Sequence, residues 1–215
     1  MNDNYRHKGL RKNLVSEIKA KGIKDERVLE AIGKVPRHFF LDNAFVEFAY
    51  SNKAFPIGAG QTISHPYTVA FQSELLKVKK GHKILEIGTG SGYQTTILLE
   101  LGAKVYSIER QKELYDKTKI LLRKMKYNAK LYYGDGYKGN TTFQPYDSII
   151  VTCGAPFIPE DLLGQLKVGG KLVIPVGELD SQIMTLVTRV SETDFTKKTF
   201  GDFKFVPMLE RKARG

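Results

Sequence analysis

The sequence predicts an α/β fold in which a mostly parallel, seven-stranded sheet has helices on both faces and an N-terminal helical cap. From residue 83 onward, strand-like apolar segments alternate with helix-like segments, which is the pattern of a parallel sheet covered on both faces. A glycine-rich turn at residues 88–92 connects the first of these strands to the next helix. The first 79 residues show helical spacing without strand alternation.

Length and composition are those of one globular domain. The chain has 215 residues, of which 41% are hydrophobic and 27% charged. A second compact domain of ordinary size would leave each half with only a small core. We therefore expect a single domain over residues 1–215, with a helical cap and substrate segment at 1–79 and a ligand-binding α/β core at 80–215.

The cap is predicted from helical spacing and breaker residues. Leu10, Leu14 and Ile18 recur every four residues, which predicts an amphipathic helix, and Asp25 is the expected N-cap of a second, short helix. Residues 35–60 are expected to be irregular, because prolines and glycines interrupt any period. Pro66 suits the first turn of a helix ending near residue 78, since its missing N–H costs nothing there.

The core is predicted as alternating strands and helices. Strands are expected at 83–87, 104–109, 130–133, 146–152, 171–176, 182–190 and 199–206, and helices at 93–100, 111–125 and 159–165. Ligands of such folds bind at the carboxyl ends of the strands. No helix separates the last two strands, so we expect an antiparallel hairpin at the end of the sheet.

The chain is basic, with a net charge of +11, which would attract acidic partners without choosing among RNA, DNA and proteins. Because no tight run of five or more basic residues occurs, a solvated lysine-rich surface is favoured and no specific nucleic-acid partner is expected.

Residues 1–12 do not resemble a signal peptide, and no apolar run approaches the roughly 20 residues that span a bilayer. We expect a cytoplasmic protein that does not engage the membrane.

The glycine-rich turn (LEIGTGSGY, residues 85–93) predicts a nucleotide-like ligand. Gly88, Gly90 and Gly92, with Thr89 and Ser91 between them, permit a tight turn and close approach of a ligand to the backbone. The position of the turn between a predicted strand and a predicted helix is the context that such a site requires. A merely flexible turn is the competing interpretation.

Two residues beside the turn favour S-adenosylmethionine over a dinucleotide. Tyr93 stands where a dinucleotide site has its final glycine, so close helix packing is compromised. Glu86, two residues before the first glycine, would repel a pyrophosphate but suits the amino and sulfonium groups of S-adenosylmethionine. Glu86 is therefore predicted to bind the cofactor.

Two acidic positions after later strands fit the same cofactor. Glu109 ends the second core strand, 21 positions after Gly88, the spacing at which an acid reaches ribose hydroxyls. Asp135 and Gly136 follow the third strand, where Asp135 could accept a hydrogen bond from an adenine amino group, although a simple turn is the alternative. With residues 86–92, these positions resemble the Rossmann-like class I methyltransferases.

Upstream of the turn, residues 58–67 (GAGQTISHPY) resemble the signature segment of the protein-L-isoaspartate O-methyltransferases. The resemblance extends through residues 35–37, 151–156, 166–177 and 205–207, which is nearly the whole chain beyond the N-terminal helices. Three departures are His65 in place of a frequent glutamine, Val168 in place of a common proline, and Cys153-Gly154 in place of alanines. None of them removes a polar group that the chemistry needs.

The resemblance implies a protein-repair enzyme. It would transfer a methyl group from S-adenosylmethionine to the α-carboxylate of isoaspartyl residues in damaged peptides and proteins, leaving S-adenosylhomocysteine. Ser64 is implied as the active-site serine, and an N-capping role for it is compatible. Thr62 and Ile63 are implied beside the cofactor. The implied substrate-binding residues are Ile63, Ser64, Thr152, Ala155, Val206 and Pro207. His65 is given no catalytic role, because a solvent-facing position suits it equally well.

The implied chemistry needs neither a general base nor a metal. A carboxylate of this kind has a pKa near or below about 4, so it is already ionised at neutral pH. Alignment of the reacting atoms and exclusion of water are then the main catalytic work. The lone Cys153 has no Cys or His neighbours at metal-ligand spacing, so it is expected to be a small buried residue at a strand end, and no metal is expected.

Three alternatives remain open. An RNA methyltransferase shares the cofactor fold and suits the basic charge, but neither an Asn-Pro-Pro-Tyr type segment nor a catalytic cysteine pair is present. A binding module with a dead site is disfavoured by the intact glycine turn, Glu109 and Ser64. An NAD-dependent oxidoreductase is disfavoured by Tyr93 and Glu86.

Overall fold

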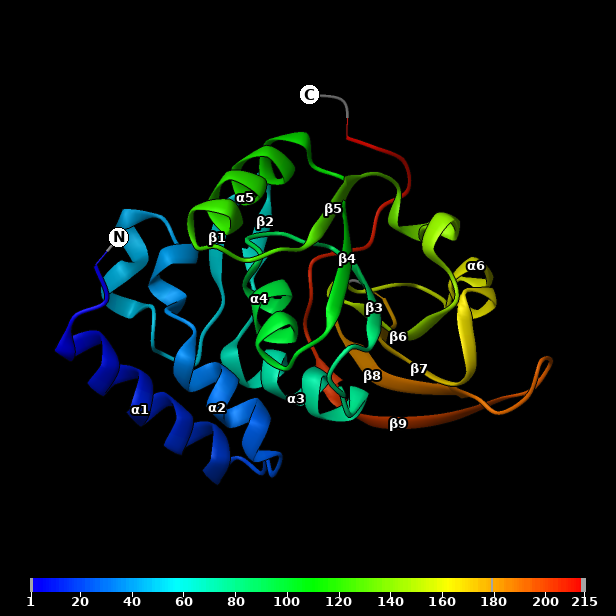
Figure 1. Cartoon of the computed structure of the whole chain (residues 1–215), viewed down its shortest axis with the longest axis horizontal. Helices are drawn as coiled ribbons and strands as arrows, with labels where there is room; N and C mark the ends of the chain where they lie inside the picture. Colours follow the sequence, from blue (N-terminus) through cyan, green and yellow to red (C-terminus); the bar gives the residue numbers. More distant parts are fainter. Residues whose placement is uncertain (1, 179, 214–215) are drawn as a thin grey trace.

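The computed structural model describes residues 2–178 and 180–213 and has a seven-stranded sheet at its centre (Figure 1). The strand order is β5-β4-β3-β6-β7-β8-β9. Their bounds are β3 Lys83–Ile87, β4 Lys104–Glu109, β5 Lys130–Tyr133, β6 Tyr146–Val151, β7 Leu166–Val176, β8 Gln182–Arg189 and β9 Phe195–Phe203. The pairs from β5 to β7 are parallel, whereas β7–β8 and β8–β9 are antiparallel. The predicted mostly parallel sheet is confirmed.

The antiparallel part of the sheet is larger than expected. The predicted final hairpin is present as β8 and β9, but β8 is also antiparallel to β7. Only residues 177–181 connect β7 to β8, which is too few for the crossover that a parallel pair requires. The strand β7 also begins five residues earlier than predicted, because the backbone accommodates a register shift where β6 pairs with it.

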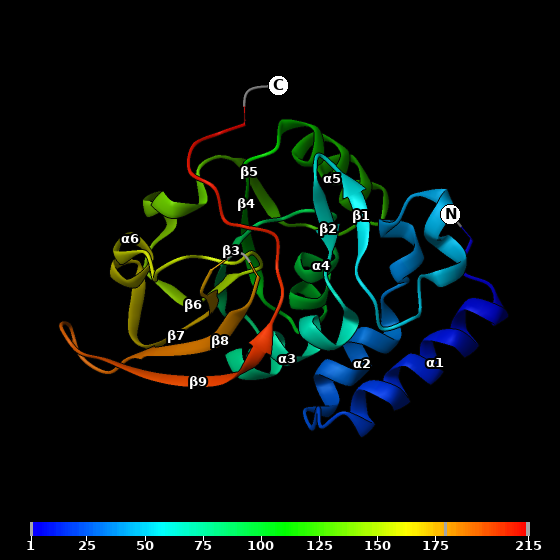
Figure 2. The same ribbon diagram turned by 180° about the vertical axis from the view of Figure 1, so that it is seen from behind.

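Helices cover the sheet unequally on its two faces. The α-helices are α1 Tyr5–Ala20, α2 Glu26–Lys34, α3 Pro66–Leu76, α4 Tyr93–Glu100, α5 Lys112–Lys124 and α6 Glu160–Gly164. Helices α3, α4 and α5 contact the strands, and α1 and α2 pack outside α3 and α4 (Figures 1 and 2). The opposite face is covered by α6, by short 3-10 turns at Gly136–Lys138 and Thr141–Phe143, and by the C-terminal segment.

The two faces of the sheet form separate cores, as the side-chain alternation of a strand requires. In β3, Ile84 joins a core shared with helices α1 to α5. Leu85 and Ile87 point to the other side and join a core with Leu162 of α6 and Met208. Both faces are therefore buried, and within β3 only Lys83 at the amino end is partly exposed.

The stretch predicted to be irregular, residues 35–60, has regular elements. It contains two 3-10 helices, Arg37–Phe40 and Asn43–Phe48, and the strand β1 Phe55–Gly58, which pairs antiparallel with β2 Gln61–Ile63. The prolines and glycines do prevent an α-helix, but positive φ angles of +97° at Gly58 and +67° at Gly60 allow the sharp turn between the strands. This hairpin delivers Ser64 to the start of α3.

The end of the chain leaves the sheet earlier than predicted. Strand β9 ends at Phe203, and Val206 is not part of it. The backbone of this segment pairs elsewhere: Gly154 N–H donates to the Val206 carbonyl at 2.8 Å, and Gly154 forms a parallel bridge with Pro207. The C-terminal segment, red in Figure 2, therefore leaves β9 and runs past the loop that follows β6.

Candidate active site

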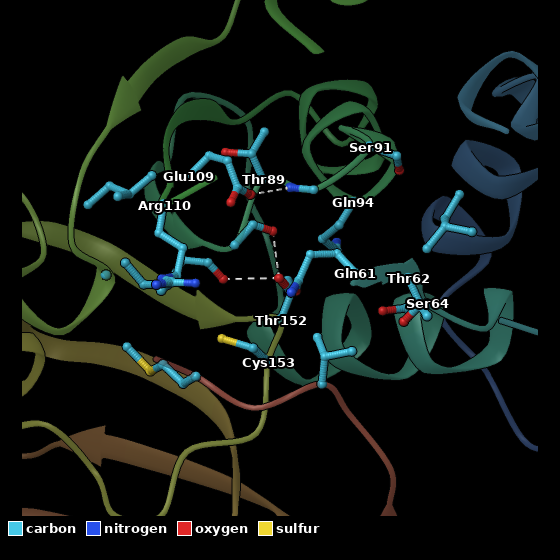
Figure 3. Close-up of a pocket in the computed structure, with 18 of the residues that line it drawn as sticks. Gln61, Thr62, Ser64, Thr89, Ser91, Gln94, Glu109, Arg110, Thr152 and Cys153 are labelled. Carbon is cyan, nitrogen blue, oxygen red and sulfur yellow. Dashed lines mark hydrogen bonds between the residues drawn. The ribbon is translucent and has the colours of Figure 1, made fainter. Parts of the chain in front are cut away.

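A cavity lies at the carboxyl ends of β3, β4 and β6, where the sequence predicts ligand binding (Figure 3). It encloses about 770 Å³ of empty space when its open mouth is counted. The predicted site residues that line it are Thr62, Ile63, Ser64, Gly88, Thr89, Gly90, Ser91, Glu109, Gly136, Thr152, Val206 and Pro207. The predicted residues Glu86, Gly92, Asp135 and Ala155 do not line it.

The glycine turn forms one wall of the cavity because its conformation excludes side chains. Gly88 has φ +94°, and a Cβ there would lie 2.5 Å from Oγ1 of Thr152. Gly90 has φ +53° and exposes its backbone to the cavity. Gly92 serves packing instead, since a Cβ on it would lie 2.7 Å from Cγ2 of Thr118 in α5. The turn can therefore hold a ligand against its backbone at Gly88 and Gly90, while Gly92 permits close helix contact.

Glu109 is held at the cavity by backbone donors. Its Oε2 accepts from Gly90 N–H at 2.8 Å, and its Oε1 accepts from Gln111 N–H at 2.8 Å. Burial raises the pKa of this carboxyl, and the backbone donors oppose that shift. Each carboxylate oxygen has a second lone pair, so the group can accept two further hydrogen bonds from neighbouring hydroxyls.

Glu86 lies beneath the turn rather than in the cavity. Its carboxyl is fully buried, and its Oε2 accepts from Thr95 Oγ1 at 2.5 Å and from Ser107 Oγ at 2.6 Å. Its Oε1 is buried without a partner among the described residues. Burial raises the pKa of Glu86 to about 7. The expectation that a Glu86 charge faces the cofactor is corrected, because a carboxyl removed from water in this way holds its proton more strongly than a free one.

The substitution Glu86→Gln is expected to gain stability relative to the unchanged protein as pH rises. Below pH 4.5, the ordinary pKa of the group, Glu86 is protonated in the folded and in the unfolded chain. Above that pH the unfolded chain loses this proton, while the folded chain keeps it until about pH 7. The folded state therefore loses roughly 3 kcal/mol across this window, and glutamine does not. Melting temperatures at several pH values measure the effect, with the exposed Glu30→Gln as control. A pH-independent difference between the two proteins would contradict it.

Asp135 holds the chain turn rather than facing the cavity. Its Oδ1 accepts from Tyr137 N–H at 3.0 Å, and its Oδ2 accepts from Arg211 N–H at 2.8 Å. Its carboxylate therefore caps the 3-10 turn and ties it to the C-terminal segment, and the adenine contact predicted for it stays a prediction. Gly136 does line the cavity, and a side chain there would collide with Ile87.

The Ser64 side chain remains available to a ligand. The N-cap of α3 is His65, without a side-chain capping bond, and Asn52 Oδ1 instead accepts from Tyr67 N–H at 2.9 Å. Ser64 lines the same cavity as Gly90, and its Oγ has no hydrogen bond with any residue that the structure describes. The capping role considered for Ser64 is therefore not used.

His65 lies outside this cavity and lines a neighbouring surface groove. Its side chain is exposed, and its pKa is lowered by partial burial and by the charge of Arg37. His65 is therefore separated from the residues that line the cavity with Ser64.

The loop after β6 completes the cavity. Thr152 Oγ1 donates to the Gly88 carbonyl at 2.6 Å, which connects this loop to the glycine turn. Cys153 lines the cavity, and burial raises the pKa of its thiol to about 12, so it is protonated at neutral pH. Ala155 is fully buried, with its N–H bonded to the Pro175 carbonyl at 2.9 Å, so its predicted contact with substrate is corrected.

Several cavity residues were not predicted. They are Gln61, Val69, Ile87, Tyr93, Gln94, Ile108, Arg110, Cys153, Met208 and Leu209. Arg110 and Cys153 directly follow strand ends that the sequence does show, so the rule that sites lie at strand ends could have found them. Val69 and Gln94 lie on helices, where only the packing of α3 and α4 decides which side faces the cavity.

Within the described part of the chain, Asp3, His7 and His38 bring possible metal ligands within 4.8 Å of one another. Both Asp3 oxygens already accept from Arg11, and His38 lies at hydrogen-bond distance from Tyr50 and from the Asn2 carbonyl. The group therefore ties the N-terminal residues to the cap.

Among the described helices, none is both long and apolar enough to cross a membrane.

Comparison with known proteins finds similar chains along nearly the whole length. The family model described as protein-L-isoaspartate(D-aspartate) O-methyltransferase matches residues 9–213. A protein from Christiangramia forsetii named protein-L-isoaspartate O-methyltransferase is 64% identical over 213 residues, which is 99% of this chain and 100% of that protein. The protein of the same name from Flavobacterium johnsoniae is 62% identical with the same coverage.

Solved structures share the fold. A crystal structure from Plasmodium falciparum, assigned as a protein-L-isoaspartate O-methyltransferase and in complex with S-adenosyl-L-homocysteine, aligns with a TM-score of 0.81 at 26% identity. The alignment covers 93% of this chain and 98% of that one. A second structure of a protein with this name aligns with a TM-score of 0.83 at 27% identity, over 95% of this chain and 66% of the other. The predicted Rossmann-like methyltransferase fold is confirmed.

Proposed function

The chain belongs to the protein-L-isoaspartate(D-aspartate) O-methyltransferase family, and from this we infer that it transfers a methyl group from S-adenosylmethionine to isoaspartyl residues of damaged proteins. The observation that carries this function to individual residues is the shared cavity of the glycine turn, Glu109 and a free Ser64 hydroxyl. The RNA methyltransferase considered as an alternative loses its support, since the match to the repair-enzyme family spans residues 9–213.

The polar groups that line the cavity suit S-adenosylmethionine. We propose that the backbone of Gly88 and Gly90, with Thr89 and Ser91, holds the cofactor against the turn, and that Glu109 accepts from the ribose hydroxyls. Thr62, Ile63 and Gly136 close the remaining sides. When bound, the cofactor supplies an electrophilic methyl group, which passes to the carboxylate oxygen while the electron pair of the broken bond remains on sulfur.

Ser64 is proposed to hold the methyl acceptor. Its hydroxyl donates to the isoaspartyl α-carboxylate and fixes the attacking oxygen, which is ionised at neutral pH and needs no base. Cys153 does not compete as a nucleophile, because its thiol is protonated. The backbone of Ile63, Thr152, Val206 and Pro207 is proposed to grip the substrate as a short extended strand, which tolerates many sequences.

The chain is proposed to act as one domain, in which residues 1–79 supply the cap and the substrate segment and residues 80–215 supply the cofactor-binding core. Both parts contribute to one hydrophobic core, which supports this division of roles within a single unit.

The enzyme is proposed to act in the cytoplasm on isoaspartyl-containing proteins. Cell fractionation with an antibody against the protein tests that location.

The direct test uses labelled S-adenosylmethionine and two peptides of identical sequence, one with isoaspartate and one with aspartate. Only the isoaspartyl peptide is expected to become labelled, because its free α-carboxylate is attached directly to the main chain, whereas the carboxylate of aspartate lies one methylene farther out and would be misaligned with Ser64. The product should be a base-labile methyl ester. Equal labelling of both peptides, or labelling of neither, contradicts the proposed function, and labelling of RNA in a parallel reaction would support the alternative.

A further inference from the structure

Arg37 is a buried cation without a carboxylate partner. Its side chain is completely buried, and none of the ion pairs among the described residues includes it. Burial lowers its pKa to about 10, so it stays charged at neutral pH. A charge removed from water without an opposite charge is destabilising unless neighbouring polar groups compensate for the lost solvent. This arrangement calls for a reason other than packing.

The guanidinium connects two segments, the loop before β1 and the residue that follows β2, through three main-chain carbonyls. Its Nη1 donates to the Ala49 carbonyl at 2.6 Å, and its Nη2 donates to those of Lys53 at 2.9 Å and Ser64 at 3.1 Å. The group also lies 5.6 Å from the ring centroid of Tyr93, which lines the cavity. A planar fork of donors is suited to such a junction, because it fixes the carbonyls relative to one another. The main chain of Ser64 is thus fixed by a hydrogen bond from the buried Arg37.

The charge of Arg37 also reaches the surface beside Ser64. The adjacent residue, His65, has its pKa lowered by partial burial and additionally by Arg37. No acid among the described residues forms an ion pair with Arg37, so its field is not cancelled by a contact partner. The methyl acceptor is an anion before transfer and a neutral ester afterwards. A positive charge close to Ser64 therefore favours substrate over product.

We propose that Arg37 is a positioning residue that fixes the main chain of Ser64 and supplies the positive charge that attracts the ionised methyl acceptor. The role rests on the proposed function, because it concerns the same carboxylate. Two variants separate its parts: Arg37→Lys keeps the charge and loses the fork, whereas Arg37→Gln loses the charge and keeps a donor. Arg11→Gln is the matched control, because Arg11 is also a buried arginine of the cap but is paired with Asp3 at 2.9 Å.

The experiment measures binding of an isoaspartyl peptide, and of the same peptide with its α-carboxylate amidated, to protein loaded with S-adenosylhomocysteine. The unchanged protein and Arg37→Lys are expected to prefer the carboxylate about tenfold, and Arg37→Gln to lose most of that preference. In turnover, Arg37→Lys is expected to lower kcat about tenfold with KM nearly unchanged, because Ser64 is less firmly held. Arg11→Gln should lower the melting temperature and keep the preference.

An equal preference in the unchanged protein and Arg37→Gln overturns the role of the charge, and a normal kcat in Arg37→Lys overturns the positioning role. If Arg37→Gln does not fold, Arg37→Met replaces it for the binding comparison. Calorimetry with S-adenosylhomocysteine checks that the cofactor site is intact in every variant. The proposed function fails separately, through a lack of isoaspartyl methylation by the unchanged protein, so the two failures are distinguishable.

Discussion

Replacement of Ser64 by alanine is expected to lower kcat for isoaspartyl peptides by about 100-fold and to change the affinity for S-adenosylhomocysteine by less than about twofold. The hydroxyl lines the cavity and forms no hydrogen bond with the described residues, so its removal breaks no internal contact. What is lost is the donor that orients the attacking oxygen. Steady-state kinetics and calorimetry on the same preparation measure both quantities.

Two further variants make the result specific. Ser64→Thr keeps a hydroxyl and is expected to recover part of the lost turnover. Ser51→Ala is the control, because Ser51 lies in the same cap and its hydroxyl already donates to the Phe48 carbonyl at 2.8 Å. A Ser64→Ala protein that has normal turnover, or that has lost cofactor binding instead, would falsify the division of roles between Ser64 and the glycine turn.

Replacement of Glu109 by alanine is expected to weaken binding of S-adenosylhomocysteine by about 100-fold or more. Two hydrogen bonds to a charged group contribute on the order of 3 kcal/mol together, which corresponds to this change in affinity. The Gly90 N–H also loses the acceptor that lies 2.8 Å away, so the glycine turn is less firmly fixed. Calorimetric titration with S-adenosylhomocysteine measures the loss directly, without any substrate.

The control for this change is Glu113→Ala. Glu113 is an exposed acid in the first turn of α5, close to Glu109 in sequence and outside the cavity. Its replacement changes the charge of the protein equally and should leave cofactor affinity unchanged. An unaltered affinity in Glu109→Ala would show that the carboxylate serves only the backbone of the turn and not the ribose.

The predicted residues that do line the cavity include those that local pattern fixes. The turn from β3 to α4 has three glycines because their positive φ angles are costly for other residues, and this requirement is visible in the sequence itself. Glu109 was predicted because it ends a strand, and its neighbours in the sheet bring it to the edge shared with Gly90. The helix at Tyr93–Glu100 also has its predicted bounds, and it begins directly after Gly92, the last glycine of the turn.

The errors come from residues whose environment depends on distant segments. The local sequence predicts a cofactor contact for Glu86, but its carboxyl is hydrogen-bonded by Thr95 and Ser107 from two other elements. Val206 was assigned to the last strand, but its backbone pairs with Gly154. In each case the local sequence permits both outcomes, and the partner that decides between them lies 9 to 52 positions away along the chain.

The sequence alone determined the alternation of strands and helices from β3 to β7, the glycine turn and the acid at the end of β4, because each depends on backbone preferences and on the spacing of apolar residues. Only the tertiary structure decided that the Ser64 hydroxyl is free, that Glu86 is sealed from the cavity and that Arg37 is buried against the Ser64 carbonyl. The physical reason is that burial and hydrogen-bond partners of polar groups are set when segments far apart in the chain meet, and no local pattern records which segments will do so.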